Sequence, residues 1–415
     1  MQNKYLSMRK IRLNRELRKD VDRIYAERIH SPSTIVFDFK LGEYPIFVMV
    51  TPQLMELFIR IHRDSVQLGS LQDYALPDIA KTWYLTKILV DEIKLTNDME
   101  NVHSTRKEVK DAVESVENLD RAPDIRFYGM AAKYYSLSRQ PIDVLKTCAD
   151  VRKLYDAFVY KEVVAEKPQD ALDGQLFRKE HVFVQDIHGN NVHEGSYPES
   201  AIIEDLEKAL SIFNDESVDR LIRIAVFHYL FGYIHPFYNG NGRLSRYISS
   251  MALSDELNTL VGLRLSYVIK DHKRQYDQLF KEANDKRNMG DLTDFVESFC
   301  SYVSIALQDM IDTLQSGEDF VHLIDEIIQH NEPLNKYKHL FQILGWNGLF
   351  AEDSLSIKEL QFHSGLGRST VEKALGIAND MEILTITRSG HKYLYTIKPD
   401  AWLELQRWSG ARAGH

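Results

Sequence analysis

The feature that most constrains the fold of this chain is an apolar helix that must end at a histidine. Between Ile224 and Ile234 the sequence is apolar almost all round a helical projection, which is the pattern of a helix buried on every side. We expect this helix to begin near Val218, with Ser217 as its N-cap. The proline that follows His235 cannot continue the helix, so the histidine is held at the end of a central core helix.

A tight turn follows this histidine and opens a second helix. In the turn Gly240–Gly242, glycine lets backbone N–H groups close around an anion, and a helix that starts there adds the positive end of its dipole. Arg243 and Arg246 have i, i+3 spacing, which places both guanidinium groups on one helix face. A histidine ordinarily titrates near neutral pH, so we expect His235 to be able to accept a proton. The segment therefore has the parts of a phosphate-binding cradle with a general base at its edge.

The segment resembles the motif of the Fic family, usually written H-x-F-x-[D/E]-G-N-G-R-x-x-R. The matching positions are His235, Phe237, Gly240, Asn241, Gly242, Arg243 and Arg246. The resemblance covers roughly residues 80 to 310 and implies a mainly α fold, with a Fic-type helical core and a β-hairpin flap. It also implies a protein adenylyltransferase, which moves AMP from ATP to a Ser, Thr or Tyr hydroxyl of a target protein and releases pyrophosphate.

The resemblance assigns a role to each matched residue. His235 would deprotonate the target hydroxyl, and Phe237 would anchor the loop in the core. Asn241 and the N–H groups of the glycine turn would hold the α-phosphate. Arg243 would bind the β side of the triphosphate, and Arg246 the γ-phosphate. Such a site would act through positioning and charge neutralisation, which supply most of the catalysis in phosphoryl-type transfer.

The acidic position of the motif is occupied by Asn239. In the family, the carboxylate at this position helps to hold the Mg²⁺ that bridges the phosphates, whereas an asparagine oxygen brings no negative charge. Metal affinity should therefore fall unless another acid substitutes. The change leaves open weak transfer, a preference for Mn²⁺ over Mg²⁺, a different nucleotide, or the reverse reaction that removes AMP.

A second motif lies upstream, at Thr96–Asn101, at the end of an amphipathic helical run. It resembles the inhibitory pattern [S/T]-x-x-x-E-[G/N] of many Fic proteins, in which Thr96 and Glu100 occupy the defined positions. The resemblance implies that Glu100 binds Arg246 and blocks productive binding of the γ-phosphate. The alternative is a plain helix C-terminus with Asn101 as its cap.

Two further assignments depend on the family pattern. Phe177–Val184 has the composition of a strand, Asp186–Asn191 has turn chemistry, and Val192 begins a return strand. The family has a hairpin flap here that docks the target segment by strand addition, although a generic surface hairpin has the same pattern. Tyr276 falls where the family lines its adenine pocket, although a helical tyrosine also serves plain packing. His228 is expected to be a packed, hydrogen-bonded core residue.

The C-terminal part resembles a winged-helix domain. Ser356–Glu359 is a capping box, Gly365–Gly367 a turn, Ser369–Glu372 a second capping box, and residues 384–397 a hairpin. Such domains often bind DNA through their second helix. From Glu332 onward, however, 10 Lys/Arg and 9 Asp/Glu give a net charge of +1, against −11 for the rest of a chain whose total is −10. Because a basic stripe is missing, protein docking or dimerisation is favoured over DNA binding.

Length and composition limit the class of protein and the number of domains. The 415 residues are 44% hydrophobic and 27% charged, which is typical of a globular protein of two or three domains. We expect an N-terminal region with the inhibitory helix at 1–110, a catalytic core at 111–315 and a winged-helix domain at 316–415, with a break at Ser316–Asp319. No run is long enough to span a membrane, and two isolated cysteines suit a reducing cytoplasm.

The sequence thus predicts a cytoplasmic adenylyltransferase that binds ATP with Mg²⁺ or Mn²⁺ and is inhibited by its own Glu100. Its target would be an unidentified protein, the chain itself included, and homodimers are common among relatives. One alternative keeps the site and changes the chemistry, to AMP removal or to transfer of another phosphate-containing group. The other is a DNA-binding regulator whose Fic core has become a nucleotide sensor.

Overall fold

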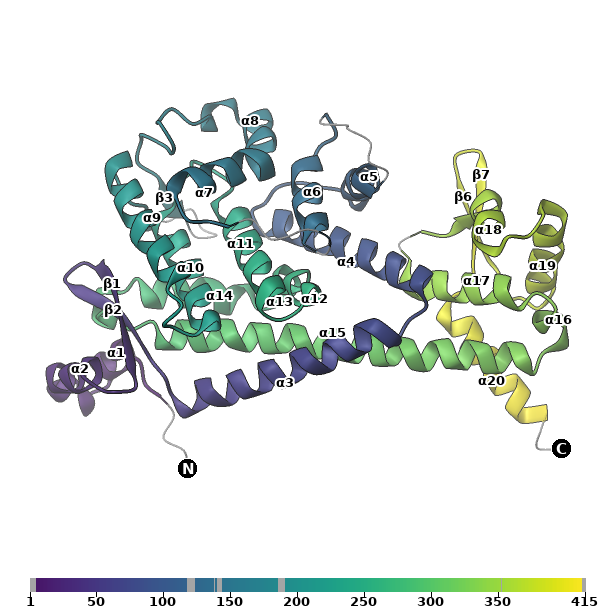
Figure 1. Ribbon diagram of the computed structural model, residues 1–415, viewed down its shortest axis with the longest axis horizontal. Helices are drawn as coiled ribbons and strands as arrows, with labels where there is room; N and C mark the ends of the chain where they lie inside the picture. Colours follow the sequence, from purple (N-terminus) through teal and green to yellow (C-terminus); the bar gives the residue numbers. More distant parts are fainter. Residues whose placement is uncertain are drawn as a thin grey trace. The chain divides into compact units, whose positions relative to one another are not determined.

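The computed structural model describes residues 5–117, 124–137, 139, 144–185, 191–351 and 353–412 of the chain. These residues are mainly helical and include three small antiparallel sheets (Figure 1). The predicted fold class, a mainly α chain with small β elements, is confirmed. No helix among these residues has the length and apolar character that crossing a bilayer requires.

The chain divides into two compact units. The first consists of Met1–Val66 and Leu89–Met310, and the second of Gln67–Ile88 and Ile311–His415. The boundaries fall inside three long helices, α3 (Pro52–Tyr74), α4 (Asp78–Met99) and α15 (Thr293–Gln329). The division into 1–110, 111–315 and 316–415 stays a prediction.

The first unit is built around the predicted central helix, α10 (Arg220–Ile234). Every residue from Leu221 to Phe231 is buried, as expected for a helix that is apolar almost all round. Helices α9 (Glu199–Asn214) and α11 (Asn241–Glu256) pack against it. His228 is fully buried on α10 and hydrogen-bonded, which confirms its expected role in the core.

The predicted N-cap of α10 was wrong. Ser217 donates its hydroxyl to Asp215 at 2.7 Å, in a turn that precedes the helix. The side chain of Asp219 caps α10 instead, since it accepts a hydrogen bond from the backbone N–H of Leu221 at 2.9 Å. An aspartate is as good an N-cap as a serine, so composition alone did not separate the two positions.

Short helices and one hairpin surround this centre. They are α5 (Arg106–Glu117), α6 (Tyr128–Ser136), α7 (Cys148–Tyr155), a π-helical turn (Asp156–Tyr160), α8 (Lys161–Glu166), a 3-10 turn (Pro168–Asp170), β3 (Phe183–Gln185), β4 (Asn191–Glu194), α12 (Thr259–Gly262), α13 (Leu265–Asp271) and α14 (Lys273–Ala283). Strands β3 and β4 pair antiparallel.

The N-terminal segment of the chain also belongs to this unit. It forms α1 (Met8–Leu13), a 3-10 turn (Leu17–Asp20), α2 (Val21–Ile29) and an antiparallel hairpin of β1 (Thr34–Leu41) and β2 (Tyr44–Met49). The backbone of Phe47 in β2 accepts a hydrogen bond from Leu292 N–H, and its own N–H donates to the Gly290 carbonyl, each at 2.9 Å. The loop between α14 and α15 is therefore joined to β2.

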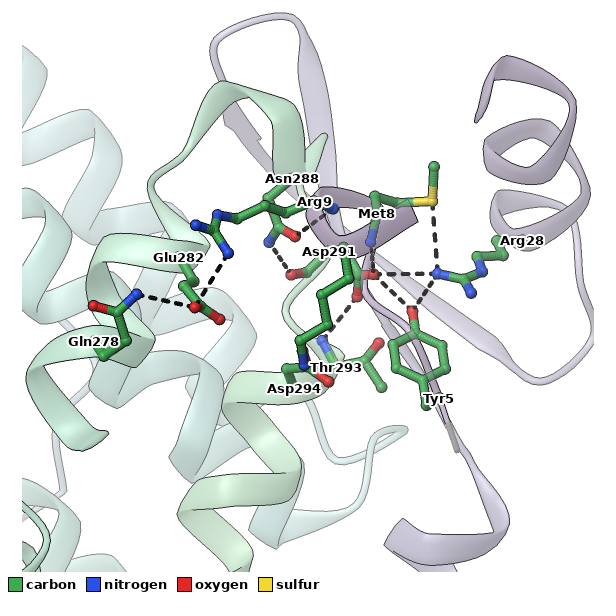
Figure 2. A network of polar contacts seen from close by, with 11 residues as sticks. Tyr5, Met8, Arg9, Arg28, Gln278, Glu282, Asn288, Asp291, Thr293 and Asp294 are labelled. Carbon is green, nitrogen blue, oxygen red and sulfur yellow. Dashed lines mark hydrogen bonds and ion pairs between the residues drawn. The ribbon is translucent and has the colours of Figure 1, made fainter. Parts of the chain in front are cut away.

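A buried carboxylate fastens the N-terminus to the same loop (Figure 2). Asp291 is 1% exposed, and its Oδ2 accepts hydrogen bonds from the Tyr5 hydroxyl at 2.7 Å and from Met8 N–H at 3.0 Å. The Arg28 guanidinium lies 3.5 Å from the same oxygen. Burial raises the pKa of Asp291, although Tyr5 and Arg28 oppose that shift. The first residues of the chain thus hold the loop that follows α14.

In the second unit, α15 runs without interruption through Ser316–Asp319 to Gln329, so the chain forms no loop there, and the domain break predicted at these residues stays a prediction. Gly317 lies inside this helix and serves close packing: a Cβ there would lie 2.9 Å from Cζ of Phe350. The remaining elements are α16 (Glu332–Asn335), α17 (Lys338–Phe350), β5 (Leu355–Ser356), α18 (Ile357–Ser364), α19 (Arg368–Asp380), β6 (Thr385–Ser389), β7 (Lys392–Thr396) and α20 (Pro399–Arg412).

One of the two predicted capping boxes is present. Ser356 caps α18 and exchanges hydrogen bonds with Glu359, as predicted. The predicted second box at Ser369–Glu372 is wrong, because α19 already begins at Arg368 with Gly367 as N-cap. The predicted hairpin is β6–β7, and β5 adds a strand that the sequence did not reveal, giving the order β5-β7-β6. The winged-helix assignment and DNA binding stay predictions.

Candidate nucleotide-binding site

His235 is the C-cap of α10 and has a left-handed backbone, with φ 53°. Its Nδ1 lies 3.4 Å from the carbonyl of Gly232, which can only accept, so Nδ1 carries the proton and Nε2 is free to act as a base. Burial lowers the pKa of His235 to about 4; the Gly232 carbonyl and Glu100 act against this shift, and Arg178 and His193 act with it. The imidazole is therefore neutral at pH 7.

The loop after His235 is held closed by two of the predicted residues. The amide of Asn241 accepts from Phe237 N–H at 3.0 Å and donates to the Phe237 carbonyl at 2.7 Å. The Phe237 ring is fully buried and stacks on Tyr155 at 3.7 Å between centroids. Both polar atoms of the Asn241 side chain are thus used inside the loop, and what remains for an anion is the start of α11. The first intrahelical bond there runs from Leu244 N–H to the Gly240 carbonyl.

Arg243 lies on the first turn of α11 and is 0% exposed. Among the described residues, none of its three guanidinium nitrogens has a hydrogen-bond partner. Burial lowers the pKa of Arg243, although Glu100, Glu166 and Glu162 oppose that shift. A buried cation without a partner among these residues is costly, which makes Arg243 a candidate for binding an anion.

Arg246 lies one turn further along α11, and its guanidinium is hydrogen-bonded to residues at the end of helix α4. Its Nε donates to the Thr96 hydroxyl at 2.8 Å and its Nη2 to the Thr96 carbonyl at 3.1 Å. The same Nη2 donates to Oε1 of Glu100 at 2.8 Å, in an ion pair whose arginine is 2% exposed. Burial raises the pKa of Glu100, but Arg246, Arg243 and His235 together lower it more, so the pKa lies below its ordinary value and the carboxylate is charged. The contact predicted between Glu100 and Arg246 is present.

Glu100 is placed by the way α4 ends. Asn101 adopts a left-handed φ of 57°, and Val102 N–H donates to the Asn97 carbonyl at 3.0 Å, as in a Schellman motif. The alternative reading, a helix end capped by Asn101, is therefore also correct, because the cap is what presents Glu100. A Cβ at Gly242 would clash with Oε1 of Glu100, so the carboxylate lies directly against the start of α11.

A pocket of about 1000 Å³ opens beside these residues and is lined by His235, Gly242, Arg246, Glu100 and, from α14, Tyr276. Tyr276 is 9% exposed, and its hydroxyl lies 2.7 Å from Nε2 of His228. The other nitrogen of His228 meets the Ser249 hydroxyl at 2.8 Å. Of the residues that the sequence placed in one site, the pocket is lined by Glu100, His235, Asn241, Gly242, Arg246 and Tyr276, and not by Asn239, Gly240 or Arg243. The structure adds His228 as the partner that fixes Tyr276.

Comparison with known proteins now identifies the domain. Residues 147–253 match the model of the Fic/DOC family. The chain contains a Fic domain. The Fic domain includes the whole loop from His235 to Arg246, and the predicted resemblance is confirmed.

Curated relatives of the Fic domain are named protein adenylyltransferase Fic. The relative from Drosophila ananassae is 28% identical over 165 residues, which are 39% of this chain and 29% of the relative. That from Drosophila melanogaster is 27% identical over 184 residues, or 43% of this chain and 32% of the relative. The match thus spans roughly a third of these relatives' own length. A solved Fic family protein from Desulfovibrio desulfuricans G20 shares the fold, with a TM-score of 0.51 and 20% identity over 84% of this chain and 97% of that one.

Asn239 departs from the Fic motif. It lies beside Asp170, an acid that the sequence did not single out. Its Oδ1 accepts from Gly240 N–H at 2.7 Å, and its Nδ2 donates to Oδ2 of Asp170 at 3.2 Å. The part of the chain that the structure describes contains no cluster of three or more His, Cys, Asp or Glu that could hold a metal. The Asn239 amide presents its nitrogen to Asp170, so it would have to turn before its oxygen could face a cation there. A carboxylate and an amide oxygen are ligand types that suit Mg²⁺ or Mn²⁺ when phosphates supply the other ligands.

The predicted flap of the Fic domain is shorter than its sequence pattern. The strand begins at Phe183, not at Phe177, and the neighbours Phe177 and Arg178 are both fully buried, without the alternation between faces that a half-exposed strand shows. Of the predicted turn at Asp186–Asn191, residues 186–190 lie outside the described residues. Sequence reasoning missed Arg178 as part of the site, since nothing in its spacing points to His235.

Proposed function

We propose that this chain is a protein adenylyltransferase whose activity is restrained by Glu100. The observation that carries the proposal is the buried guanidinium of Arg243, which has no partner among the described residues and lies on the first turn of α11. The start of this helix, at Gly242, lines one pocket together with the neutral His235. This arrangement suits a polyphosphate beside a general base. The names of the relatives favour ATP and a protein hydroxyl as the two substrates.

The proposed reaction is an in-line displacement at the α-phosphorus of ATP. The hydroxyl oxygen of the target forms a bond to this phosphorus, and its proton passes to Nε2 of His235. The bond from the phosphorus to the oxygen that bridges to the β-phosphate breaks, and pyrophosphate leaves with the electron pair. Arg243 would neutralise the charge that develops on the leaving group, which is the main protein contribution in such a transfer.

The metal has a restricted part in this proposal. Asn239 and Asp170 would hold Mg²⁺ or Mn²⁺ together with phosphate oxygens. When bound, the cation would neutralise phosphate charge. Asn239 would be a neutral ligand. Of these two residues, only Asp170 would bring a negative charge to the cation.

Inhibition would follow from competition for Arg246. The outer phosphate of ATP needs the guanidinium that Glu100 and Thr96 already fill. The carboxylate also lies against Gly242, where phosphate oxygens would approach the first N–H groups of α11. Nucleotide could then enter the pocket, but its triphosphate would not reach the geometry needed for displacement.

The test is self-labelling with α-phosphate-labelled ATP, with Mg²⁺ and with Mn²⁺. The panel is the native chain, Glu100→Gly, and Glu100→Gly combined with His235→Ala. We expect the label to rise with the first change and to vanish with the second. Absence of label from Glu100→Gly under both metals, while it still binds ATP, would refute transfer by this site.

AMP removal is a second candidate, and the charged Glu100 carboxylate in the pocket favours it. Because the pKa of Glu100 lies below its ordinary value, the group stays ionised and could orient a water molecule for attack on a protein-linked AMP. This activity has the opposite dependence on Glu100. Release of AMP from protein labelled by Glu100→Gly should require added native chain, and Glu100→Gly should not release it.

A further inference from the structure

Arg178 lies between the flap and the loop that carries His235. It is 0% exposed, and its hydrogen bonds among the described residues all go to backbone carbonyls. Nε donates to His235 O at 2.9 Å, and Nη2 lies 3.4 Å from Ile234 O. Nη1 donates to Glu180 O at 2.7 Å and Nη2 to Ser196 O at 2.9 Å, so the residue also reaches both sides of the flap.

These carbonyls need a donor for physical reasons. Ile234 and His235 end α10, and the last carbonyls of a helix have no intrahelical partner and carry the negative end of its dipole. The left-handed backbone of His235 also costs about 1 kcal/mol or more in a residue that is not glycine, so surrounding contacts must hold it. The Arg178 guanidinium supplies the donor for the His235 carbonyl and shares the Ile234 carbonyl with Ser196 N–H.

The surroundings are shaped to admit this guanidinium. A Cβ at Gly195 would lie 2.5 Å from Nη2 of Arg178 and 3.0 Å from Cβ of His235. Any larger residue at 195 would push the two side chains apart. Gly195 N–H donates to the Val182 carbonyl and Ser196 N–H to the Ile234 carbonyl, each at 3.0 Å, so the return strand is itself bonded to the end of α10.

We propose that Arg178 is a positioning residue, which fixes the backbone of His235 and couples it to the flap on which the target segment would dock. The proposal rests on the function proposed above, in which His235 is the general base. The flap and the base would then move as one body, so that a docked hydroxyl and Nε2 keep a constant separation.

The charge of Arg178 has a second effect. Burial lowers the pKa of His235, and the Arg178 cation and His193 lower it further, while the Gly232 carbonyl and Glu100 raise it. Loss of the cation should therefore raise this pKa. A purely structural arginine elsewhere would leave the titration of His235 unchanged, which gives the test a specific readout.

The test compares Arg178→Gln and Arg178→Lys with Arg223→Gln, all in the full chain carrying Glu100→Gly. Arg223 is the matched control, because it is 9% exposed and donates to the Phe213 carbonyl near the other end of α10. The measurements are kcat and KM for ATP in self-labelling, and the His235 midpoint by NMR of histidine-labelled protein. We expect Arg178→Gln to lower kcat about 10- to 100-fold, leave KM within about twofold and raise the midpoint.

The conservative variant separates charge from geometry. Arg178→Lys keeps the cation but cannot reach four carbonyls, so we expect the native midpoint with a reduced kcat. Arg223→Gln should leave both quantities unchanged. Native kcat and a native midpoint in Arg178→Gln would overturn the proposal.

Two further outcomes keep the test decisive. If Glu100→Gly itself gives no label, the transferase proposal fails, and the His235 midpoint alone then decides for or against Arg178. If Arg178→Gln does not fold, Gly195→Ala carries the test, since it displaces the guanidinium without removing it. A reduced kcat in Gly195→Ala supports the coupling, and an unchanged kcat overturns it.

Discussion

Oε1 of Glu100 lies 2.8 Å from Nη2 of Arg246, across 146 residues of sequence. The pair joins the end of α4 to the first turns of α11, in the pocket that also contains His235. The Thr96 hydroxyl and carbonyl bind the same guanidinium, so two positions of one short motif hold a single side chain. In the proposed function, the Glu100 carboxylate thereby competes with a phosphate for the Arg246 guanidinium.

The isosteric change Glu100→Gln should release most of this restraint. It keeps the shape of the side chain but removes the charge, and a neutral amide competes poorly with phosphate for Arg246. We expect the initial rate of self-labelling to rise about 5- to 100-fold. Glu108→Gln is the control, because Glu108 pairs with Arg126 at 3.3 Å and does not line the pocket. An equal rise in both variants would mean that the effect is not specific to Arg246.

The rate of labelling should be insensitive to mild acid. The base must be neutral, and activity falls as pH drops through its folded-state pKa, which lies at about 4 for His235 rather than at 6.5. In Glu100→Gly the carboxylate that raises this pKa is absent, so the midpoint should not be higher. Initial rates between pH 5 and 8, with thermal melts at each pH to confirm folding, will measure this. A loss of activity centred near pH 6.5 would contradict the burial of His235.

Arg243→Met should stabilise the nucleotide-free protein while abolishing polyphosphate binding. The native guanidinium is buried with no described partner, so an apolar side chain of similar length removes a desolvated charge. We expect about 1–3 kcal/mol of added stability in urea unfolding. Pyrophosphate should raise the Tm of the native chain and leave that of the variant unchanged.

The control for this change is Arg264→Met. Arg264 is also largely buried, but it has a carboxylate partner, with its Nε 2.6 Å from Asp309. Its removal should lower stability and leave the response to pyrophosphate intact. Destabilisation by Arg243→Met of the same size would show that Arg243 has a structural role.

Asn239→Asp should lower the stability of the metal-free protein and raise its affinity for Mg²⁺. The change replaces the hydrogen bond from Nδ2 to Asp170 by two carboxylates at about the same separation, which repel each other. We expect the free energy of unfolding of the metal-free variant to be about 1–2 kcal/mol lower than that of the native chain. Added Mg²⁺ should raise the Tm of the variant more than that of the native chain. Transfer with Mg²⁺ should also rise. Asn239→Ala, which adds no charge, should show no gain from Mg²⁺.

The contacts of Asp291 with Tyr5, Met8 and Arg28 should contribute strongly to the stability of the first unit. Asp291→Ala leaves the Tyr5 hydroxyl and the Arg28 guanidinium without their buried partner, which should cost about 3–5 kcal/mol in urea unfolding. Asp294→Ala removes the 2.5 Å contact with Lys10 at a more exposed position, where the loss should stay below about 1 kcal/mol. Equal effects would mean that burial of Asp291 does not set its contribution.

Features of the site that are local in sequence were predictable. The loop from His235 to Arg246 follows from glycine chemistry, from the apolar helix before it and from arginine spacing. Glu100 was found because Thr96–Asn101 resembles the inhibitory pattern of Fic proteins, which is also short and local in sequence. Asp170, Arg178 and His228 gained their roles only through contacts with residues distant in sequence, and their own neighbours show no periodicity that indicates a partner. The caps at Asp219 and Gly367 were missed for another reason, since several residue types can end a turn there.

Gly242 is constrained from two sides. Its missing side chain leaves room for the Glu100 carboxylate, and the same room would admit phosphate oxygens. Under the proposed function, a side chain at this position would displace the Glu100 carboxylate and also obstruct the phosphates, so we expect Gly242→Ala not to raise self-labelling. Activating changes should instead accumulate in the last turn of α4. In the proposed function, the space above Gly242 is used in turn by the Glu100 carboxylate and by the phosphates. Displacement of Glu100 would therefore leave a space that already fits the nucleotide.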